Sequence, residues 1–163
     1  MILPIAKLPA RVLRRPVKPL SFPLKKSQLR LIKDMLKTVR AARGVGLAAP
    51  QVSQSLDLAL IHLEDAGLAG FPIINPVIVK SSKETESAEE GCLSMPGVFG
   101  LVVRPKKITV TARDPEGNSF TITDDGFLAR VLQHEIDHLR NILIIDKFSK
   151  ITQGTDLLAK YQT

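Results

Sequence analysis

The sequence predicts an α+β fold, in which antiparallel strands pack around a central helix and an amphipathic helix lies near the N-terminus. Two segments have apolar residues at helical spacing, and five short apolar runs bounded by turn residues lie between them. Because no helix separates these runs, we expect their strands to be antiparallel. The 163 residues fit one domain spanning residues 1–163, and the 44% of apolar residues suffice for a core.

The first predicted helix spans residues 27–43. Prolines keep the chain before it extended or turning, since proline fixes the backbone and lacks an N–H group. Ser27 suits the N-cap and Gly44 suits the position after the last turn. The helical periodicity comes from Leu29, Ile32, Leu36 and Val39.

The predicted strands follow the first helix. The segment "RDPEGN" is a strong turn signal, so the last two strands are expected to form a hairpin. The polar, acidic stretch 81–90 is interpreted as an exposed loop. The strand-like runs are 57–63, 71–79, 98–104, 107–114 and 119–123.

The second predicted helix spans about residues 123–140, with Thr123 or Asp124 as its cap. Between Phe127 and Leu132 it is apolar nearly all round except at Arg130, as expected for a helix buried on most sides. This helix is therefore predicted to be the central one, and it carries the chemistry.

The second helix contains "HEIDH", the pattern H-E-x-x-H. At about 100° per residue, His138 lies only about 40° round the helix from His134, so both imidazoles can share one metal ion. Glu135 projects about 100° away, which suits a base acting on a water. Phe127 and Val131 fall about 20° and 60° from His134 and form an apolar wall. The alternative is two ordinary core histidines with an ordinary glutamate.

A catalytic site of the zinc type needs three protein ligands and an open position. The candidates for the third ligand are His62, Cys92 and the carboxylates. His62 lies in an apolar run, where a structural role is the default. Cys92 lies in "EEGCLSMPG", whose glycines and proline indicate an irregular backbone. One Cys with two His would suit Fe(II), Zn(II), Co(II) or Ni(II).

The segment "GVGLAAPQ" (44–51) is too small and too rich in glycine for an ordinary core segment. Gly44 and Gly46 permit positive φ or the close approach of another backbone. The segment lacks the G-K-[ST] ending of a phosphate-binding loop. Taken alone, this segment is interpreted as a helix end followed by a turn.

Charge and composition limit the functional classes. Residues 1–56 hold twelve Lys/Arg and one acid, a balance of +11, against −4 for the remainder. Such a basic region favours electrostatic attraction to a polyanion such as an RNA-rich partner, but no aromatic residues interleave with it for base stacking. No run reaches the roughly 18 apolar residues of a membrane span. The single cysteine agrees with a reducing compartment.

Three segments together resemble the signature motifs of one family. "GVGLAAPQ", "EGCLS" and "QHEIDHL", in this order, are similar to the three motifs of peptide deformylases, and the resemblance spans nearly the whole chain. It implies an α+β fold around the histidine-bearing helix. It also implies one divalent metal ion per chain, typically Fe(II), with Zn(II) or Ni(II) accepted.

The resemblance also implies residue roles. The expected reaction removes the formyl group from the N-terminal formyl-methionine of nascent chains. Cys92, His134 and His138 would hold the metal, and Glu135 would move the proton. The side-chain amide of Gln51 and the backbone N–H of Leu93 would stabilise the oxyanion. Val45 and Gly46 would bind the extended peptide, and Phe127 and Val131 would line the methionine pocket.

Two alternatives rest on single features. A zinc endopeptidase is supported by H-E-x-x-H alone and needs a third ligand downstream, where only Asp146 and Asp156 offer carboxylates. A non-catalytic metal-binding or RNA-binding module is supported by the basic region alone. For a deformylase we expect electrostatic contact with the ribosome through residues 7–43, no membrane association, and a location in a bacterial cytoplasm or an organellar stroma or matrix.

Overall fold

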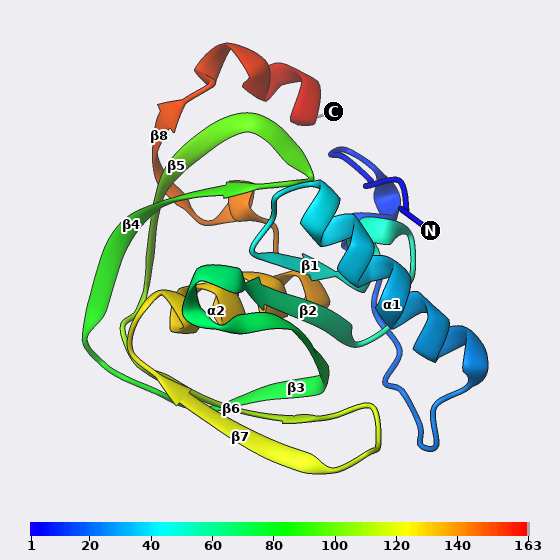
Figure 1. Ribbon diagram of the computed structural model, residues 1–163. Helices are drawn as coiled ribbons and strands as arrows, with labels where there is room; N and C mark the ends of the chain where they lie inside the picture. Colours follow the sequence, from blue (N-terminus) through cyan, green and yellow to red (C-terminus); the bar gives the residue numbers. More distant parts are fainter. Residues whose placement is uncertain (163) are drawn as a thin grey trace.

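The computed structural model describes residues 1–162 and has the predicted α+β architecture. Two antiparallel sheets enclose the histidine-bearing helix α2, which lies at the centre of the molecule in Figure 1. One sheet has five strands in the order β1-β2-β3-β6-β7, and the other has three in the order β4-β5-β8. Residues far apart in the sequence therefore meet around α2.

Helix α1 spans Lys26–Ala41, close to the predicted helix, but its ends differ from the prediction. Lys25 rather than Ser27 is the N-cap, and its backbone N–H donates to the side chain of Gln28 at 2.9 Å. The left-handed residue after the helix is Arg43, with φ of +53°, rather than Gly44. The Gly44 N–H bonds to the carbonyl of Val39 at 2.9 Å, which closes the last turn.

The five-stranded sheet supports both helices. Strand β2 is buried on both faces, because α1 packs against one face and α2 against the other. Strands β6 and β7 form the predicted hairpin, with Arg113 opposite Ser119 at its turn. The strands are β1 (Gly46–Ala48), β2 (Leu58–Leu63), β3 (Leu68–Ser81), β6 (Ile108–Arg113) and β7 (Ser119–Asp124).

The three-stranded sheet corrects one prediction and adds a strand that was missed. It contains β4 (Thr85–Cys92), β5 (Met95–Pro105) and β8 (Phe148–Gln153). The stretch 81–90, predicted as a loop, is mostly strand β4. Its polar side chains are largely exposed, so its alternation is weak, and backbone pairing with β5 makes it a strand. Strand β8 was missed for the same reason, since it is polar and depends on pairing with β5.

Helix α2 spans Phe127–Leu139 and starts later than predicted. Strand β7 continues through Asp124, so Thr123 belongs to the strand. The Asp124 carboxylate accepts hydrogen bonds from the backbone N–H groups of Gly126 and Ala129, at 2.9 and 2.8 Å. It therefore satisfies the start of the helix from two residues upstream of the N-cap. At the other end, Asn141 adopts φ of +63°, as expected for an asparagine ending a helix.

Short 3-10 helices complete the chain. A separate cluster of apolar residues joins β5 to the C-terminal segments through Met95, Val102 and Tyr161. Within residues 1–162, no helix combines the length and the apolar character needed to cross a membrane. The 3-10 helices are η1 (Arg11–Arg14), η2 (Ala49–Val52), η3 (Glu64–Ala66), η4 (Ile144–Asp146) and η5 (Thr155–Tyr161).

Candidate metal centre

Cys92, His134 and His138 converge on one point between the two sheets. One ligand atom from each residue lies within 4.8 Å of the others. The Cys92 sulfur is 3.3 Å from Nε2 of His138, and the two imidazole centroids are 5.1 Å apart. Cys92 ends β4, whereas the two histidines lie one turn apart on α2. The fold thus brings the thiol of the middle motif to the histidine face of the helix.

The backbone around Cys92 explains why glycine precedes it. The register between β4 and β5 shifts between Gly91 and Cys92, and Cys92 pairs with Met95 across a tight turn. A Cβ atom on Gly91 would lie 2.5 Å from the ring of Phe99, so no larger residue fits without displacing this ring. Burial opposes ionisation of the Cys92 thiol, but the neighbouring His138 and His134 outweigh it, and the pKa of Cys92 lies well below its usual value.

His134 is oriented by a carboxylate that the sequence analysis did not single out. Its Nδ1 lies 3.0 Å from Oε1 of Glu90, which leaves Nε2 free to face the centre. A carboxylate on the second nitrogen is the usual way in which proteins fix the orientation of a ligating imidazole. Burial would lower the pKa of His134, but hydrogen bonds to Cys92 and Glu90 raise it well above its ordinary value.

Two buried arginines hold Glu90 in turn. Arg104 donates to both carboxylate oxygens, at 2.7 and 2.9 Å, and Arg130 donates to Oε2 at 2.6 Å. Although burial opposes ionisation, the contacts to His134 and Arg104 lower the pKa of Glu90 to about 2. Arg104 also donates to Asp137 at 2.8 Å. Arg130, the exception in the apolar stretch between Phe127 and Leu132, is thus held in an ion pair.

The acidic stretch before "GCLS" contained the only sequence signal for this role of Glu90. Adjacent glutamates on a strand point to opposite faces, so one of Glu89 and Glu90 must face inward if the segment is β. Because the stretch 81–90 was predicted as a loop, this alternation could not be used to place Glu90. Glu89 is exposed and accepts a hydrogen bond from Thr152, whereas Glu90 is buried.

Replacing Glu90 with glutamine is expected to destabilise the protein and weaken its metal binding. Removing one partner of a buried ion pair costs about 3–5 kcal/mol, because the arginines lose their counter-charge. Loss of the carboxylate that orients His134 should lower metal affinity about 10- to 100-fold. Chemical denaturation and metal titration measure the two effects. Glu86→Gln, the same change at an exposed position of β4, is the control, and equal behaviour of the two variants would contradict this role.

Glu135 lies beside the three-residue centre and is buried. Within residues 1–162 its Oε2 has no hydrogen-bond partner, and burial raises the pKa of its carboxyl group. A Cβ atom on Gly46 would lie 2.4 Å from Oε1 of Glu135, so glycine is required for this close approach. A buried carboxyl group without a partner is costly, which indicates that it acts on something bound at this site.

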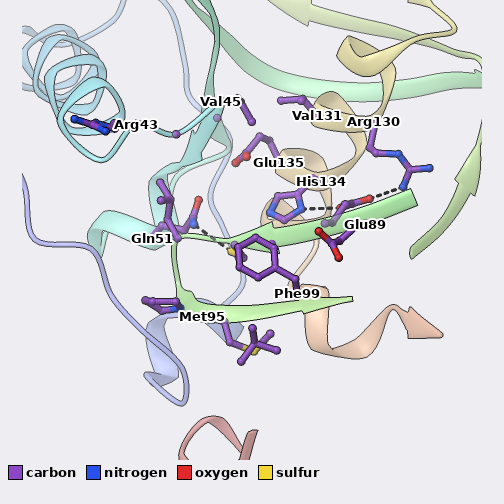
Figure 2. Close-up of a pocket in the computed structure, with 18 of the residues that line it drawn as sticks. Arg43, Val45, Gln51, Glu89, Met95, Phe99, Arg130, Val131, His134 and Glu135 are labelled. Atoms are coloured by element: carbon purple, nitrogen blue, oxygen red, sulfur yellow. Dashed lines mark hydrogen bonds and ion pairs between the residues drawn. The ribbon is translucent and has the colours of Figure 1, made fainter. Parts of the chain in front are cut away.

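Gln51 also reaches the centre, and Figure 2 shows it on the side of His134 away from Arg130. Its side-chain oxygen accepts a hydrogen bond from the Ala48 backbone at 2.8 Å. Its side-chain nitrogen is therefore turned inward and lies 3.1 Å from the Ser94 hydroxyl and 3.6 Å from the Cys92 sulfur. The Gln51 amide thus presents a fixed donor next to Cys92. Leu93 follows Cys92 and lines the same cavity.

A cavity of about 440 Å³ opens onto this centre. All but one of the residues with a site role predicted from the sequence line this cavity. The exception is His138, which is buried. Phe127 and Val131 form part of one wall, as the helical arithmetic required, and Met95, Val98 and Phe99 add an apolar surface that the sequence analysis did not anticipate. The lining residues with predicted roles are Val45, Gly46, Gln51, Cys92, Leu93, Phe127, Val131, His134 and Glu135.

The residues fit a divalent metal ion. One thiol of lowered pKa and two imidazoles form a donor set suited to a first-row transition metal, and three protein ligands leave a position open. His138 is buried, and its Nδ1 has no hydrogen-bond partner within residues 1–162. His62, one of the candidates for the third ligand, lies outside this group of three residues.

Comparisons with known proteins decide the family. The family model described as polypeptide deformylase matches residues 2–154. The chain belongs to the polypeptide deformylase family. A peptide deformylase from Symbiobacterium thermophilum is 45% identical over 150 residues, which cover 92% of this chain and 68% of that protein. One from Halothermothrix orenii is 44% identical over 151 residues, which cover 92% and 96% of the two chains.

Solved structures support the same family. The crystal structure of a peptide deformylase from Legionella pneumophila superposes with a TM-score of 0.86 at 45% identity, covering 91% of this chain and 87% of that chain. The enzyme is therefore a metal-dependent hydrolase that removes N-formyl groups, and its metal site is the Cys92, His134 and His138 group typical of deformylases. This membership also decides against the zinc endopeptidase and the non-catalytic module, since neither alternative accounts for a match over residues 2–154.

Proposed function

We propose that this enzyme, acting as a single catalytic domain, removes the formyl group from the N-terminal formyl-methionine of nascent polypeptides and releases formate. The proposal rests on one observation. The metal-binding group Cys92, His134 and His138 lies beside the buried carboxyl group of Glu135, whose Oε2 has no hydrogen-bond partner within residues 1–162, at one cavity. The other groups that the reaction requires lie within the same cavity.

Cys92, His134 and His138 would hold the metal ion. A bound divalent metal supplies Lewis acidity and lowers the pKa of a water ligand to about 7. We propose Fe(II) as the metal in the cell, with Zn(II), Ni(II) or Co(II) as substitutes, because a mixed sulfur and nitrogen donor set accepts all of them. The Glu90 carboxylate keeps the His134 ring in the ligating orientation.

Glu135 acts as the general base and then as the general acid. Its raised pKa, caused by burial, brings the carboxyl group closer to the pH at which it must both accept and donate a proton. It accepts the proton of the attacking water and returns one to the departing amine. Gly46 allows the carboxyl group to lie against the backbone along which the substrate would bind.

Gln51 and the backbone N–H of Leu93 stabilise the oxyanion that forms when the formyl carbon is attacked. The Gln51 amide is held by its bond from Ala48, so its N–H group needs little reorganisation in the transition state.

Gln51→Ala is expected to lower kcat by about 10²- to 10³-fold, because one oriented donor to the oxyanion is lost. Steady-state kinetics on a formyl-methionyl peptide measure this effect, and metal analysis of the same sample shows whether the metal stays bound. Ser94→Ala removes a neighbour of Gln51 but not the donor itself, and should have a smaller effect on kcat. Equal losses in the two variants would contradict the assignment.

The substrate backbone lies along Val45 and Gly46. Strand β1 is the edge strand of its sheet, so an extended peptide can add to its free side. The methionine side chain enters the cavity between Phe127 and Val131 on one side and the apolar residues of β5 on the other. Phe127 is 61% exposed and lines the cavity, so its ring is accessible to a ligand.

The test of this proposal is purification without oxygen, metal analysis and measurement of formate release from formyl-Met-Ala-Ser. We expect one metal ion per chain and formate release, and no cleavage within an unformylated peptide. A metal-loaded protein that releases no formate would overturn the proposal. An enzyme that loses activity in air and regains it with Fe(II) would support iron, whereas equal activity before and after exposure to air would count against it.

We also propose a partner and a compartment. All twelve Lys/Arg residues among residues 1–56 are exposed, which supports electrostatic attraction of residues 7–43 to the ribosome. A bacterial cytoplasm or an organellar stroma or matrix would supply formylated chains and keep Cys92 reduced.

Association with ribosomes is expected to weaken steeply as salt increases, because binding to phosphates releases counterions. Co-sedimentation with ribosomes between about 50 and 200 mM salt measures this dependence. Binding that is absent at low salt, or that does not respond to salt, would contradict an electrostatic contact through this region.

A further inference from the structure

The wall that β5 adds to the cavity contains a short stretch that neither neighbouring strand holds. Residues 95–99 all line the cavity. The pairing of β5 with β4 passes from Met95 directly to Phe99, so residues 96–98 have no partner in β4. Strand β8 pairs with β5 from Phe99 onward. In the part of the chain that the structure describes, residues 96–98 therefore depend on contacts outside both strand pairings.

Segment η5 supplies these contacts. The Tyr161 hydroxyl donates to the carbonyl of Pro96 at 2.8 Å, and Tyr161 itself is buried. Leu157 packs on the next residue, since a Cβ atom on Gly97 would lie 2.7 Å from its Cδ1. Neither Tyr161 nor Leu157 lines the cavity, so both support the wall from its far side. Figure 1 shows η5, in red, alongside the end of β5.

The backbone that leads into η5 approaches the same stretch of β5. Gly97 and Gly154 have φ of +82° and +80°, in the left-handed region that favours glycine. A Cβ atom on Gly154 would overlap the carbonyl oxygen of Gly97, so the two backbones are in direct contact. Tyr161, Met95 and Val98 also belong to one buried apolar cluster. The position of η5 is therefore coupled to the position of the cavity wall.

We propose that Tyr161 is a positioning residue for the pocket that takes the methionine side chain of the substrate. Its hydroxyl fixes the Pro96 carbonyl and, with it, the wall formed by residues 95–99. Figure 2 shows Val131 and Phe99 on opposite sides of His134, so this wall faces the one that α2 provides. The inference rests on the proposed function and deepens it by naming a residue that determines selectivity for the first side chain of the substrate.

Tyr161→Phe tests the proposal, because it removes the hydroxyl and keeps the buried ring. Loss of this hydrogen bond is expected to raise KM for formyl-Met-Ala-Ser about two- to tenfold. The kcat should not change, because the wall contacts the side chain equally in the ground and transition states. KM for formyl-Ala-Ala-Ser should also stay unchanged, since its first side chain is too short to reach the wall. The ratio of kcat/KM for the two peptides should therefore fall about two- to tenfold.

This ratio separates positioning from a general loss of stability. Partial unfolding lowers the rate with both peptides equally and leaves the ratio unchanged. Ser149→Ala is the matched control, because the Ser149 hydroxyl on β8 also donates to a β5 carbonyl, that of Leu101 at 3.1 Å, but Leu101 does not line the cavity. This control should keep the ratio. Leu157→Ala removes the second support of the wall and should lower the ratio, as Tyr161→Phe does.

Three results would overturn the positioning role of Tyr161. The first is a ratio in Tyr161→Phe equal to that of the unaltered enzyme. The second is an equal fall in the ratio in Ser149→Ala. The third is a lower kcat for both peptides with an unchanged ratio, which would limit Tyr161 to a role in stability. Absence of formate release by the unaltered enzyme would contradict the proposed function instead, so the two failures are distinguishable.

Discussion

Glu135→Gln is expected to lower kcat for formate release by about 10²- to 10⁴-fold while leaving the metal bound. The change keeps the size of the side chain but removes its capacity to accept and return a proton. Glu135 is not among the three clustered metal ligands, so metal content should stay unchanged. Steady-state kinetics and metal analysis on the same preparation measure both quantities.

The packing around Glu135 makes glutamine the informative replacement. Its carboxyl group is buried against Gly46, and a shorter side chain would leave a gap that water could fill. Glu116→Gln, the same chemical change in the exposed turn between β6 and β7, should behave like the unaltered enzyme. Activity of Glu135→Gln within tenfold of normal would rule out its role in proton transfer, and loss of metal together with activity would make it a ligand.

Cys92→Ala is expected to lose most of the bound metal and, with it, nearly all activity. The thiol is one of three ligand atoms within 4.8 Å of one another, and its removal leaves only two imidazoles. The loss of affinity should exceed the roughly 10- to 100-fold expected for a residue that only orients a ligand, such as Glu90. Metal titration followed by dialysis measures the affinity, and a thermal melt shows whether the fold is kept.

His62→Ala is the matched control for Cys92→Ala. His62 was the other single candidate for a third ligand beside the carboxylates, and it lies in β2, outside the metal group. Its removal should leave metal content unchanged. If Cys92→Ala keeps its metal and its turnover of a formyl-methionyl peptide while His62→Ala loses them, the assignment of the third ligand is wrong.

The ligand face of α2 could be predicted from the sequence because it depends on local geometry alone. Two residues four apart on a helix point the same way, so the spacing of His134 and His138 already determines that they can share a metal. The same arithmetic placed Phe127 and Val131 in the wall, and both line the cavity. Local reasoning was weaker at the end of α1, where Arg43 rather than Gly44 is the left-handed residue, whereas Asp124, one of the two predicted caps, does satisfy the start of α2.

Strands without a strong alternation could not be predicted, because their pairing partners lie far away in the sequence. Strand β4 consists largely of exposed polar residues and is a strand because β5 pairs with it. Because β4 was predicted as a loop, the inward position of Glu90 could not be inferred. The ion pairs that join Glu90 to Arg104 and Arg130 could therefore not be inferred either. These contacts span sequence separations of 14 to 40 residues and exist only in the folded chain.

The sequence by itself therefore determined the histidine pair, the adjacent base and, through resemblance, the family and the third ligand. These features depend on helical spacing and on motifs whose residues are consecutive in the chain. Only the tertiary structure decided what surrounds them: the carboxylate that orients His134, the glycine against which Glu135 lies, and the apolar wall that β5 adds to the cavity. The physical reason is that burial and side-chain pairing depend on which segments come into contact across the two sheets. A local sequence pattern does not determine these long-range contacts.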